Sequence, residues 1–215
     1  MENIFDIEGV RYMKSHHGHI QQMNVKPFKY NEQYNSTYDT ESYRAASKRL
    51  NEIRYKLIEM IGIKPKRLLD FGYGNGSFLD YVSERIDNCF GYDVASGYES
   101  SKWEVVTNPY GPYDVVCFWD SLEHVERLEF LSRLNTKYIA ISLPYAHISK
   151  WNVEDFKTWK HRKPDEHIHH FNKSSLVSLM EHYGYKLVCF NTKEDEVRKP
   201  ARRESNILSC LFIKK

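Results

Sequence analysis

Nine consecutive residues decide the fold: Leu68-Leu69-Asp70-Phe71-Gly72-Tyr73-Gly74-Asn75-Gly76. A short apolar run ends in the pattern D-x-G-x-G-x-G, and a helical pattern over Gly76–Ile86 follows at once. Glycines at alternate positions allow a sharp turn and let a ligand approach the backbone without Cβ clashes. The first turn of the next helix offers N–H groups that have no intrahelical partner. We therefore predict a ligand-binding strand–turn–helix unit.

The spacing of the glycines separates two kinds of nucleotide ligand. The dinucleotide fingerprint requires G-x-G-x-x-G, but Ser77 holds its final position and Gly76 falls one residue early. The carboxylate of Asp70 disfavours a pyrophosphate, whereas it attracts the ammonium and sulfonium groups of S-adenosylmethionine. Asp93 ends the next apolar run about twenty residues on, where an acid accepts hydrogen bonds from ribose hydroxyls. The pattern favours S-adenosylmethionine over NAD.

Strand-like and helix-like runs alternate along most of the chain. Predicted strands cover Arg67–Phe71, Cys89–Tyr92, Trp103–Val106, Tyr113–Phe118, Tyr138–Leu143, Tyr185–Asn191 and Ile207–Ile213. Predicted helices cover residues 41–61, Gly76–Ile86, Ser121–Leu134 and Ser174–Tyr183. This alternation predicts an α/β, Rossmann-like, doubly wound and mostly parallel seven-stranded sheet. Because no helix separates the last two strands, they should form an antiparallel C-terminal hairpin.

Two further segments lack clear periodicity. We interpret residues 1–44 as a loop-rich N-terminal arm or lid and residues 45–215 as the Rossmann-like domain, with an insert at 145–172 over the cleft. Aromatic side chains of the arm and insert are expected to stack on a ring or sugar: Tyr30, Tyr34, Tyr38, Trp151 and Trp159.

Composition limits the remaining classes. The net charge of +2 implies no partner by itself. The chain has no apolar run long enough to span a membrane and no signal-peptide pattern, so we expect a cytoplasmic protein. None of the four cysteines forms a C-x-x-C pair, which predicts reduced thiols rather than a cysteine zinc site. The oligomeric state is left open.

The run Tyr113-Asp114-Val115-Val116-Cys117-Phe118-Trp119-Asp120-Ser121-Leu122-Glu123-His124-Val125, taken with the glycine turn and Asp93, resembles class I S-adenosylmethionine-dependent methyltransferases. It is most similar to the small-molecule, quinone-biosynthesis O-methyltransferase branch, which often carries Leu-Glu-His-Val after the fourth strand. The run Glu166-His167-Ile168-His169-His170-Phe171 also resembles this branch, and the likeness covers residues 45–213. It implies methyl transfer to an oxygen or nitrogen of a small-molecule acceptor. The cofactor residues it implies are Asp70, Gly72, Tyr73, Gly74, Gly76, Asp93, Val94, Asn108, Trp119 and Asp120.

Histidines are the candidate bases. His124, His167 and His169 are expected to take the acceptor's proton, although His124 could equally make a structural hydrogen bond. Glu166 beside His167 and His169 raises the alternative of a metal site. Without a further acid or cysteine at a recognisable spacing, we expect no metal.

Basic and aromatic residues predict the acceptor's charge. The insert brings Trp159, His161, Arg162 and Lys163, and the hairpin loop brings Arg198, Lys199, Arg202 and Arg203. Guanidinium groups beside aromatic faces predict a small anionic acceptor. Three alternatives stay open. A nucleic-acid methyltransferase is disfavoured by the low net charge and by Trp119-Asp120-Ser121-Leu122 in place of an N/D-P-P-Y/F motif. A non-catalytic binding module would not need the glycines and acids. An NAD-dependent oxidoreductase is disfavoured by Ser77 and Asp70.

Overall fold

The computed structural model describes residues 4–28, 41–95, 98, 100–199 and 204–215, with the backbone alone at 41–44. Five of the residues singled out above therefore lie outside the described part of the chain: Tyr30, Tyr34, Tyr38, Arg202 and Arg203.

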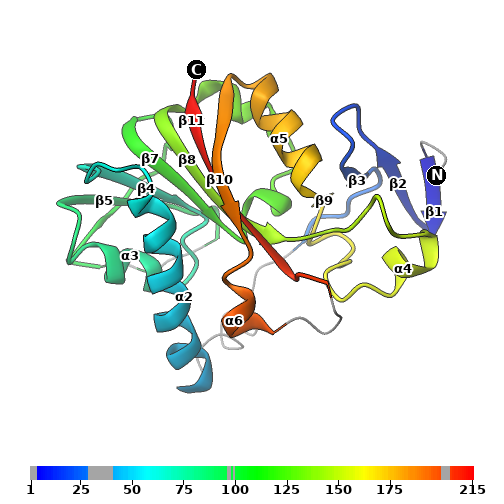
Figure 1. Cartoon of the computed structure of the whole chain (residues 1–215), viewed down its shortest axis with the longest axis horizontal. Helices are drawn as coiled ribbons and strands as arrows, with labels where there is room; N and C mark the ends of the chain where they lie inside the picture. The colour runs from blue at the N-terminus through cyan, green and yellow to red at the C-terminus, as the bar shows by residue number, and fades with distance from the viewer. Residues whose placement is uncertain (1–3, 29–40, 96–97, 99, 200–203) are drawn as a thin grey trace.

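A seven-stranded sheet forms the centre of the molecule (Figure 1). Its strands run in the order β10 (Tyr185–Asn191), β11 (Ile207–Lys214), β8 (Asn135–Pro144), β7 (Pro112–Trp119), β4 (Arg67–Phe71), β5 (Asn88–Tyr92) and β6 (Glu104–Val105). Neighbours from β8 to β6 pair in parallel, while β11 is antiparallel to both β8 and β10. The predicted fold is confirmed, and β11 lies inside the sheet with β10 at its edge.

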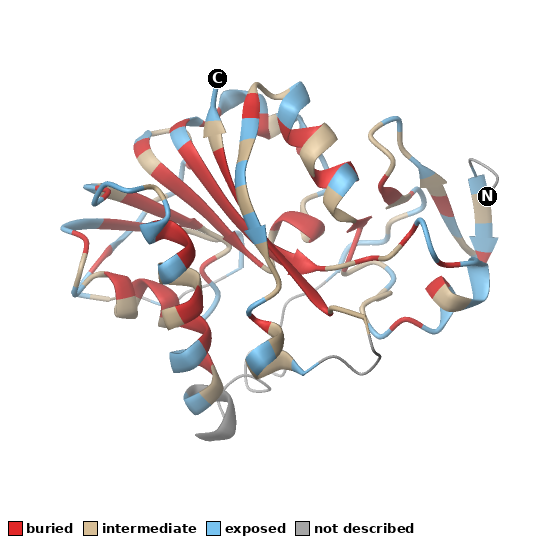
Figure 2. Cartoon of the chain, in the orientation of Figure 1, coloured by how far each residue is buried: buried red, intermediate tan, exposed pale blue. Residues whose placement is uncertain are grey.

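Helices cover both faces of this sheet. On one face α2 (Glu41–Glu59) and α3 (Ser77–Val82) pack through Leu57, Ile58 and Leu79. On the other face α5 (Lys173–His182) packs through Leu176 and Met180. The middle strands are buried along almost their whole length, as parallel strands covered on both faces must be (Figure 2).

The segment after β7 differs from the predicted helix over Ser121–Leu134. It forms two 3₁₀ helices, η1 (Leu122–His124) and η2 (Leu128–Arg133), separated by extended backbone. The carbonyl groups that an α-helix would use accept bonds from a distant segment. Ile168 N–H donates to Glu123 O at 2.9 Å, and His169 Nε2 donates to Val125 O at 3.0 Å.

The N-terminal segment also differs from the expected loop-rich arm. β1 (Ile4–Ile7), β2 (Val10–Lys14) and β3 (Ile20–Gln22) form a second antiparallel sheet with β9 (His169–His170) of the insert. Tyr12, Phe156 and Trp159 fill a separate hydrophobic cluster between this sheet and α4 (Val153–Lys157). The division into an arm and a domain stays an interpretation, but residues 4–22 are tied to the insert.

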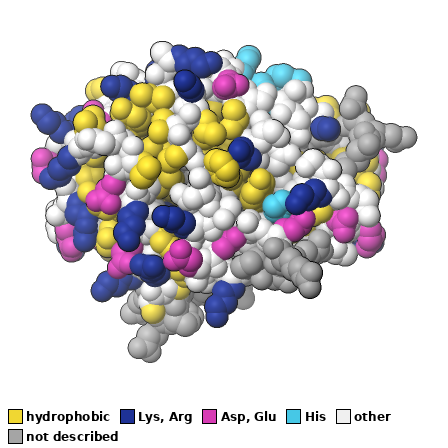
Figure 3. Space-filling model, viewed as in Figure 1, with side chains coloured by type: hydrophobic (Ala, Val, Ile, Leu, Met, Phe, Trp, Pro, Cys, Tyr) yellow, Lys and Arg dark blue, Asp and Glu magenta, His cyan; other side chains and the backbone are white. Residues whose placement is uncertain are grey.

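The surface is mixed in charge. The edge strand β10 exposes Val188 and Phe190, and hydrophobic side chains are scattered among charged ones on the face that Figure 3 shows. Among the described helices, none is long and apolar enough to cross a membrane.

Candidate functional site

The glycine turn after β4 has the backbone that its sequence predicts. Gly72, Gly74 and Gly76 all have positive φ, at 81°, 55° and 74°. A Cβ on Gly72 would lie 2.5 Å from the Cβ of Ser121, and one on Gly76 would lie 2.6 Å from the Trp103 ring. Only glycine combines such φ values with such close approach. The turn is therefore held between Ser121, after β7, and Trp103, just before β6.

Asp93, which follows β5, accepts a hydrogen bond from the backbone of this turn. Its Oδ2 accepts the Gly74 N–H at 3.0 Å, and its Oδ1 accepts the Ala95 N–H at 2.8 Å. Each carboxylate oxygen of Asp93 thus accepts a backbone N–H of this region, and the side chain lies at the end of β5, where the sequence pattern predicts the ribose.

Two buried polar atoms near the turn lack a hydrogen-bond partner among the described residues: Asp70 Oδ1 and Trp119 Nε1. Asp70 is 2% exposed near the end of β4. Burial raises the pKa of Asp70 to about 7, with the nearby Arg54 opposing and Asp93 reinforcing the shift. Buried groups of this kind ordinarily have partners. An unpaired acceptor beside a glycine turn fits a ligand that carries a cationic donor.

The remaining predicted cofactor residues are less uniform. The Tyr73 side chain is buried against Trp103, with its hydroxyl donating to Tyr98 O at 3.2 Å. Val94 is 80% exposed after β5, and Asn108 is exposed after β6 with its Oδ1 accepting the Tyr110 N–H. Tyr73 can therefore contribute backbone rather than ring contacts.

Asp120 is committed to an ion network rather than open to a ligand. Arg198 makes two hydrogen bonds to its carboxylate, and Arg54 Nη2 makes a third at 2.8 Å. Both arginines also reach Glu194, which is completely buried. These cations hold the pKa of Asp120 well below its usual range against the effect of burial. The expectation that Arg198 is free to hold an anionic acceptor is corrected, as it is for Arg162, which contacts Glu8, Tyr12 and the Ile7 carbonyl.

The three candidate histidines separate into two places. His124 and His167 meet ring to ring, with centroids 4.7 Å apart. His169 lies in a chain of neutral rings in which both of its nitrogens are used: Nε2 donates to Val125 O and Nδ1 accepts from His19. Burial lowers the pKa of His169 to about 4. His169 therefore has no ring nitrogen left to take a proton from the methyl acceptor. Its hydrogen bonds instead join β9 to His19, just before β3, and to the segment after β7.

Glu123 is a candidate site residue that the sequence analysis did not single out, although it stands in the Leu-Glu-His-Val run. It is 1% exposed, and neither carboxylate oxygen has a hydrogen-bond partner among the described residues. Burial, reinforced by Asp120, raises its pKa well above the usual range. The carboxylate of Glu123 and the rings of His124 and His167 each place one ligand atom within 4.8 Å of the others.

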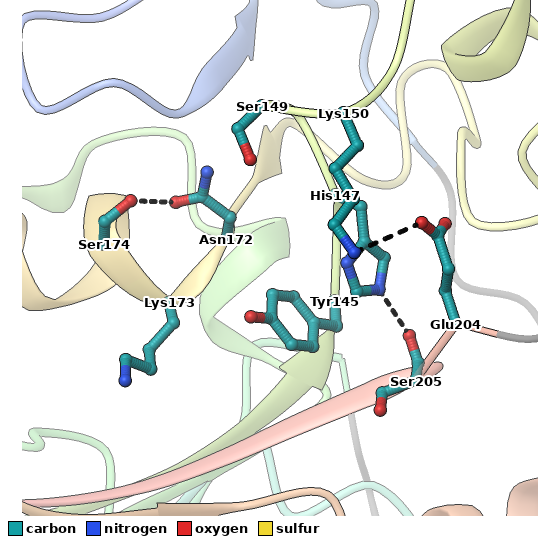
Figure 4. Close-up of a pocket in the computed structure, with 9 residues that line it drawn as sticks. All are labelled: Tyr145, His147, Ser149, Lys150, Asn172, Lys173, Ser174, Glu204 and Ser205. Carbon is teal, nitrogen blue, oxygen red and sulfur yellow. Dashed lines mark hydrogen bonds and ion pairs between the residues drawn. The ribbon is translucent and has the colours of Figure 1, made fainter.

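A pocket of about 550 Å³ opens beside the end of β8. Tyr145, His147 and Lys150 line one side, and the first turn of α5 with Lys173 lines the other (Figure 4). His147 bonds to Ser205 O at 2.8 Å, and Lys150 lies 3.8 Å from Glu204. Ligands of open α/β sheets bind at the carboxyl ends of the strands, which is the edge that this pocket occupies.

Comparison with known families decides the class. A family model described as a methyltransferase domain matches residues 38–189, which include the glycine turn, Asp93 and the Leu-Glu-His-Val run. The chain belongs to the methyltransferase-domain family. The predicted class I S-adenosylmethionine-dependent methyltransferase is thereby confirmed, and the glycine turn with its unpaired Asp70 oxygen fits that cofactor. No curated protein matches the chain in sequence.

Solved structures share the fold of this methyltransferase domain at low identity. The 1,6-didemethyltoxoflavin N1-methyltransferase of Burkholderia thailandensis is 14% identical, covers 98% of each chain and gives a TM-score of 0.57. Magnesium protoporphyrin IX methyltransferase of Synechocystis is 12% identical, over 88% of this chain and 90% of that one, with a TM-score of 0.55. The [4+2]-cyclase SpnF is 11% identical, over 89% and 98%, with a TM-score of 0.56. A cyclase on this fold shows that architecture alone does not define the reaction.

Proposed function

We propose that this methyltransferase domain is an active enzyme that transfers the methyl group of S-adenosylmethionine to an oxygen or nitrogen of a small acceptor. The observation that carries the proposal is the turn between Asp70 and α3, with three glycines at positive φ and Asp93 bound across it. The unpaired Asp70 oxygen suits the cofactor's ammonium group, and Asp93 suits its ribose hydroxyls.

S-adenosylmethionine supplies a methyl group that is already activated on a sulfonium. The chain's task is therefore to orient donor and acceptor in line and to exclude water. With the cofactor bound, the acceptor's oxygen or nitrogen would take the methyl group, the carbon–sulfur bond would break with its electron pair left on sulfur, and His124 or His167 would take the acceptor's proton. His124 and His167 contact the acceptor in this proposal, because His124 follows the strand that carries Trp119 and its ring meets that of His167.

The acceptor is proposed to enter the pocket beside Tyr145. Tyr145 and His147 stack with centroids 4.3 Å apart. Lys150 and Lys173 line the pocket with Glu204, which leaves one net positive charge there; Lys150 Nζ lies 3.8 Å from Glu204, and Lys173 Nζ lies 3.7 Å from the centroid of the Phe190 ring. Aromatic faces with cations suit a small ring that bears an anionic group. This pocket replaces the arginines Arg162 and Arg198 as the basis for an anionic acceptor.

Calorimetry with S-adenosylmethionine and with NAD tests the cofactor. The wild type should bind the former in the micromolar range and not the latter. Asp93→Ala should weaken binding by about 1–3 kcal/mol, because a charged acceptor is lost. Asp87→Ala, at an exposed acid just before the same strand, is the matched control. Tighter binding of NAD, or unchanged affinity in folded Asp93→Ala, overturns the assignment.

A turnover screen with methyl-labelled S-adenosylmethionine tests the reaction itself. Pools of small carboxylates and phosphates, neutral small molecules and nucleic acids are compared. Label should enter the anionic small-molecule pool. With that acceptor, Lys150→Gln/Lys173→Gln should raise KM and leave cofactor affinity unchanged, and added salt should act the same way. Lys186→Gln on the exposed edge strand is the control. Label in nucleic acid alone contradicts the small acceptor.

A further inference from the structure

Four acceptor groups converge on one small volume beside the cleft. They are the carboxylates of Glu123 and Glu166 and the rings of His124 and His167. His124 Nε2 lies 3.9 Å from Glu123 Oε1, and His167 Nε2 lies 3.8 Å from Glu166 Oε1. The Glu123 side chain has no hydrogen-bond donor among the described residues.

The hydrogen bonds of the two rings orient their lone pairs. His167 Nδ1 lies 2.9 Å from the His161 carbonyl, so it carries the proton and Nε2 keeps a lone pair. His124 Nε2 faces the Glu123 carboxylate at 3.9 Å, so this nitrogen lies on the same side as the other two ligand atoms. A carbonyl that takes one ring proton is the usual second shell of a metal-bound histidine. Sequence-distant segments, η1 and the insert before β9, supply these ligands.

We infer that Glu123, His124 and His167 form a binding site for one divalent transition-metal cation. Two imidazoles and one carboxylate match the ligand set that such ions prefer, whereas Mg²⁺ and Ca²⁺ prefer oxygen alone. The three ligand atoms all lie within 4.8 Å of one another, so a single ion can touch them with small side-chain movements. A bound cation would also give the buried Glu123 carboxylate the partner that it lacks among the described residues.

The site corrects the ligand set considered from sequence. As a metal ligand, His124 takes the place of His169. Glu123 takes the place of Glu166, whose carboxylate already accepts a hydrogen bond from Lys163 Nζ at 3.0 Å. The signal in the sequence is the Glu123-His124 pair of the Leu-Glu-His-Val run together with His167. If the proposed function also holds, His124 and His167 would act on the acceptor through the ion rather than as bases, and the cation would bind an oxygen of the acceptor and orient it by coordination. The binding of the ion does not depend on that function.

Zinc binding to tag-free protein tests the site directly. A second histidine group at the surface, His16, His17 and His182, has ring centroids 3.7–6.1 Å apart and could take zinc by itself. The measurements therefore use a His17→Gln/His182→Gln background. Calorimetry and elemental analysis after dialysis should give one Zn²⁺ per chain, and Co²⁺ should give visible absorption bands of a histidine–carboxylate site.

Glu123→Gln and His167→Gln should each weaken Zn²⁺ at least about 10-fold and abolish the Co²⁺ bands. His170→Gln, a buried histidine outside the cluster, should keep both. Unchanged stoichiometry and affinity in folded Glu123→Gln overturns the site, as does displacement of Zn²⁺ by equimolar Mg²⁺. If the variants fail to fold, anomalous scattering at the zinc edge from a wild-type crystal decides: an ion away from Glu123, or none at all, refutes the proposal.

Discussion

The buried Asp70 lowers the stability of the fold at neutral pH. Its pKa is raised by burial to about 7, so the folded state prefers the protonated carboxyl, whereas the unfolded chain ionises near pH 4. Folding stability therefore falls as the pH rises from about 4 to about 7, and the loss is complete above that range. An ammonium ligand that pairs with the carboxylate would reverse this loss.

Asp70→Asn should therefore separate stability from binding. At pH 8 the variant should be more stable than the wild type by up to about 4 kcal/mol, and the difference should shrink toward pH 4. Its affinity for S-adenosylmethionine should fall. Chemical unfolding across this pH range and calorimetry at pH 8 measure the two effects, with Asp87→Asn as the control. A stability difference that does not vary with pH would contradict the assigned ionisation.

Two glycines of one turn should respond differently to alanine. Gly72→Ala meets Ser121 at 2.5 Å, whereas Gly74→Ala has nothing within 4 Å, and both have positive φ. Each variant should lose about 1–2 kcal/mol for the left-handed backbone, and Gly72→Ala should lose more because Ser121 and its bond to Phe71 O are displaced. Melting curves of the pair provide the comparison. Equal losses of stability in the two variants would show that the contact with Ser121 adds no strain to the turn.

Among the elements, sequence periodicity gave the strands well and the segment after β7 poorly. β4 and β10 match their predicted bounds, because apolar runs ended by glycine or charged residues are clear local signals. The helix predicted over Ser121–Leu134 is broken because Ile168 and His169, far along the chain, take the carbonyls of Glu123 and Val125. The residues near Ser121–Leu134 in the sequence cannot indicate that a distant segment will bind these carbonyl groups.

An ion network joins three elements at the cleft and was not predictable from spacing. Arg54 of α2 reaches both Glu194 before α6 (Asp195–Arg198) and Asp120 after β7. The sequence analysis expected the basic residues of the hairpin loop to bind an anionic acceptor. Arg198, the first of them, instead pairs with Asp120 and Glu194. The acid with which an arginine pairs depends on tertiary structure. The sequence alone therefore does not indicate that Arg54 pairs with Glu194.

Replacing Arg54 alone should lower the free energy of unfolding more than replacing Arg54 and Glu194 together. Arg54→Met leaves Glu194 buried with only Arg198 nearby and should lose about 3–5 kcal/mol. Glu194→Gln combined with Arg54→Met should recover part of that loss, because no buried charge remains uncompensated at that position. Denaturant unfolding of the two single variants and the double variant measures the coupling energy. Strict additivity would mean that the pair contributes no specific interaction.

For the molecule as a whole, the N-terminal sheet and the insert act as one packed unit beside the central domain. Tyr12 is fully buried there, lies 5.2 Å from the Phe156 ring and receives a hydrogen bond from Arg162. The sequence could not reveal this unit, because β1–β3 are short and complete their sheet only with β9. Short strands depend more on context than helices do.

Tyr12→Ala should therefore loosen the insert while sparing the cofactor turn. Loss of a buried aromatic ring costs about 3–5 kcal/mol, and Tyr12→Phe should lose only about 1 kcal/mol for the hydrogen bond. Limited proteolysis should cut residues 145–168 faster in Tyr12→Ala, with S-adenosylmethionine affinity nearly unchanged. Equal loss of cofactor affinity would show that the two parts are coupled.

The pairing of β3 with β9 also sets an order of events during synthesis. Ile20 pairs with His170, and the residues between them include most of the central sheet. At about 5–20 residues per second, the ribosome makes the partner of β3 roughly 8–30 s after β3 itself. The first strands must wait as an unpaired edge while the glycine turn, Asp93 and β7 are already being made. The residues of the glycine turn are therefore made before the histidine segment that completes the small sheet, and β10 and β11 of the central sheet are made after it.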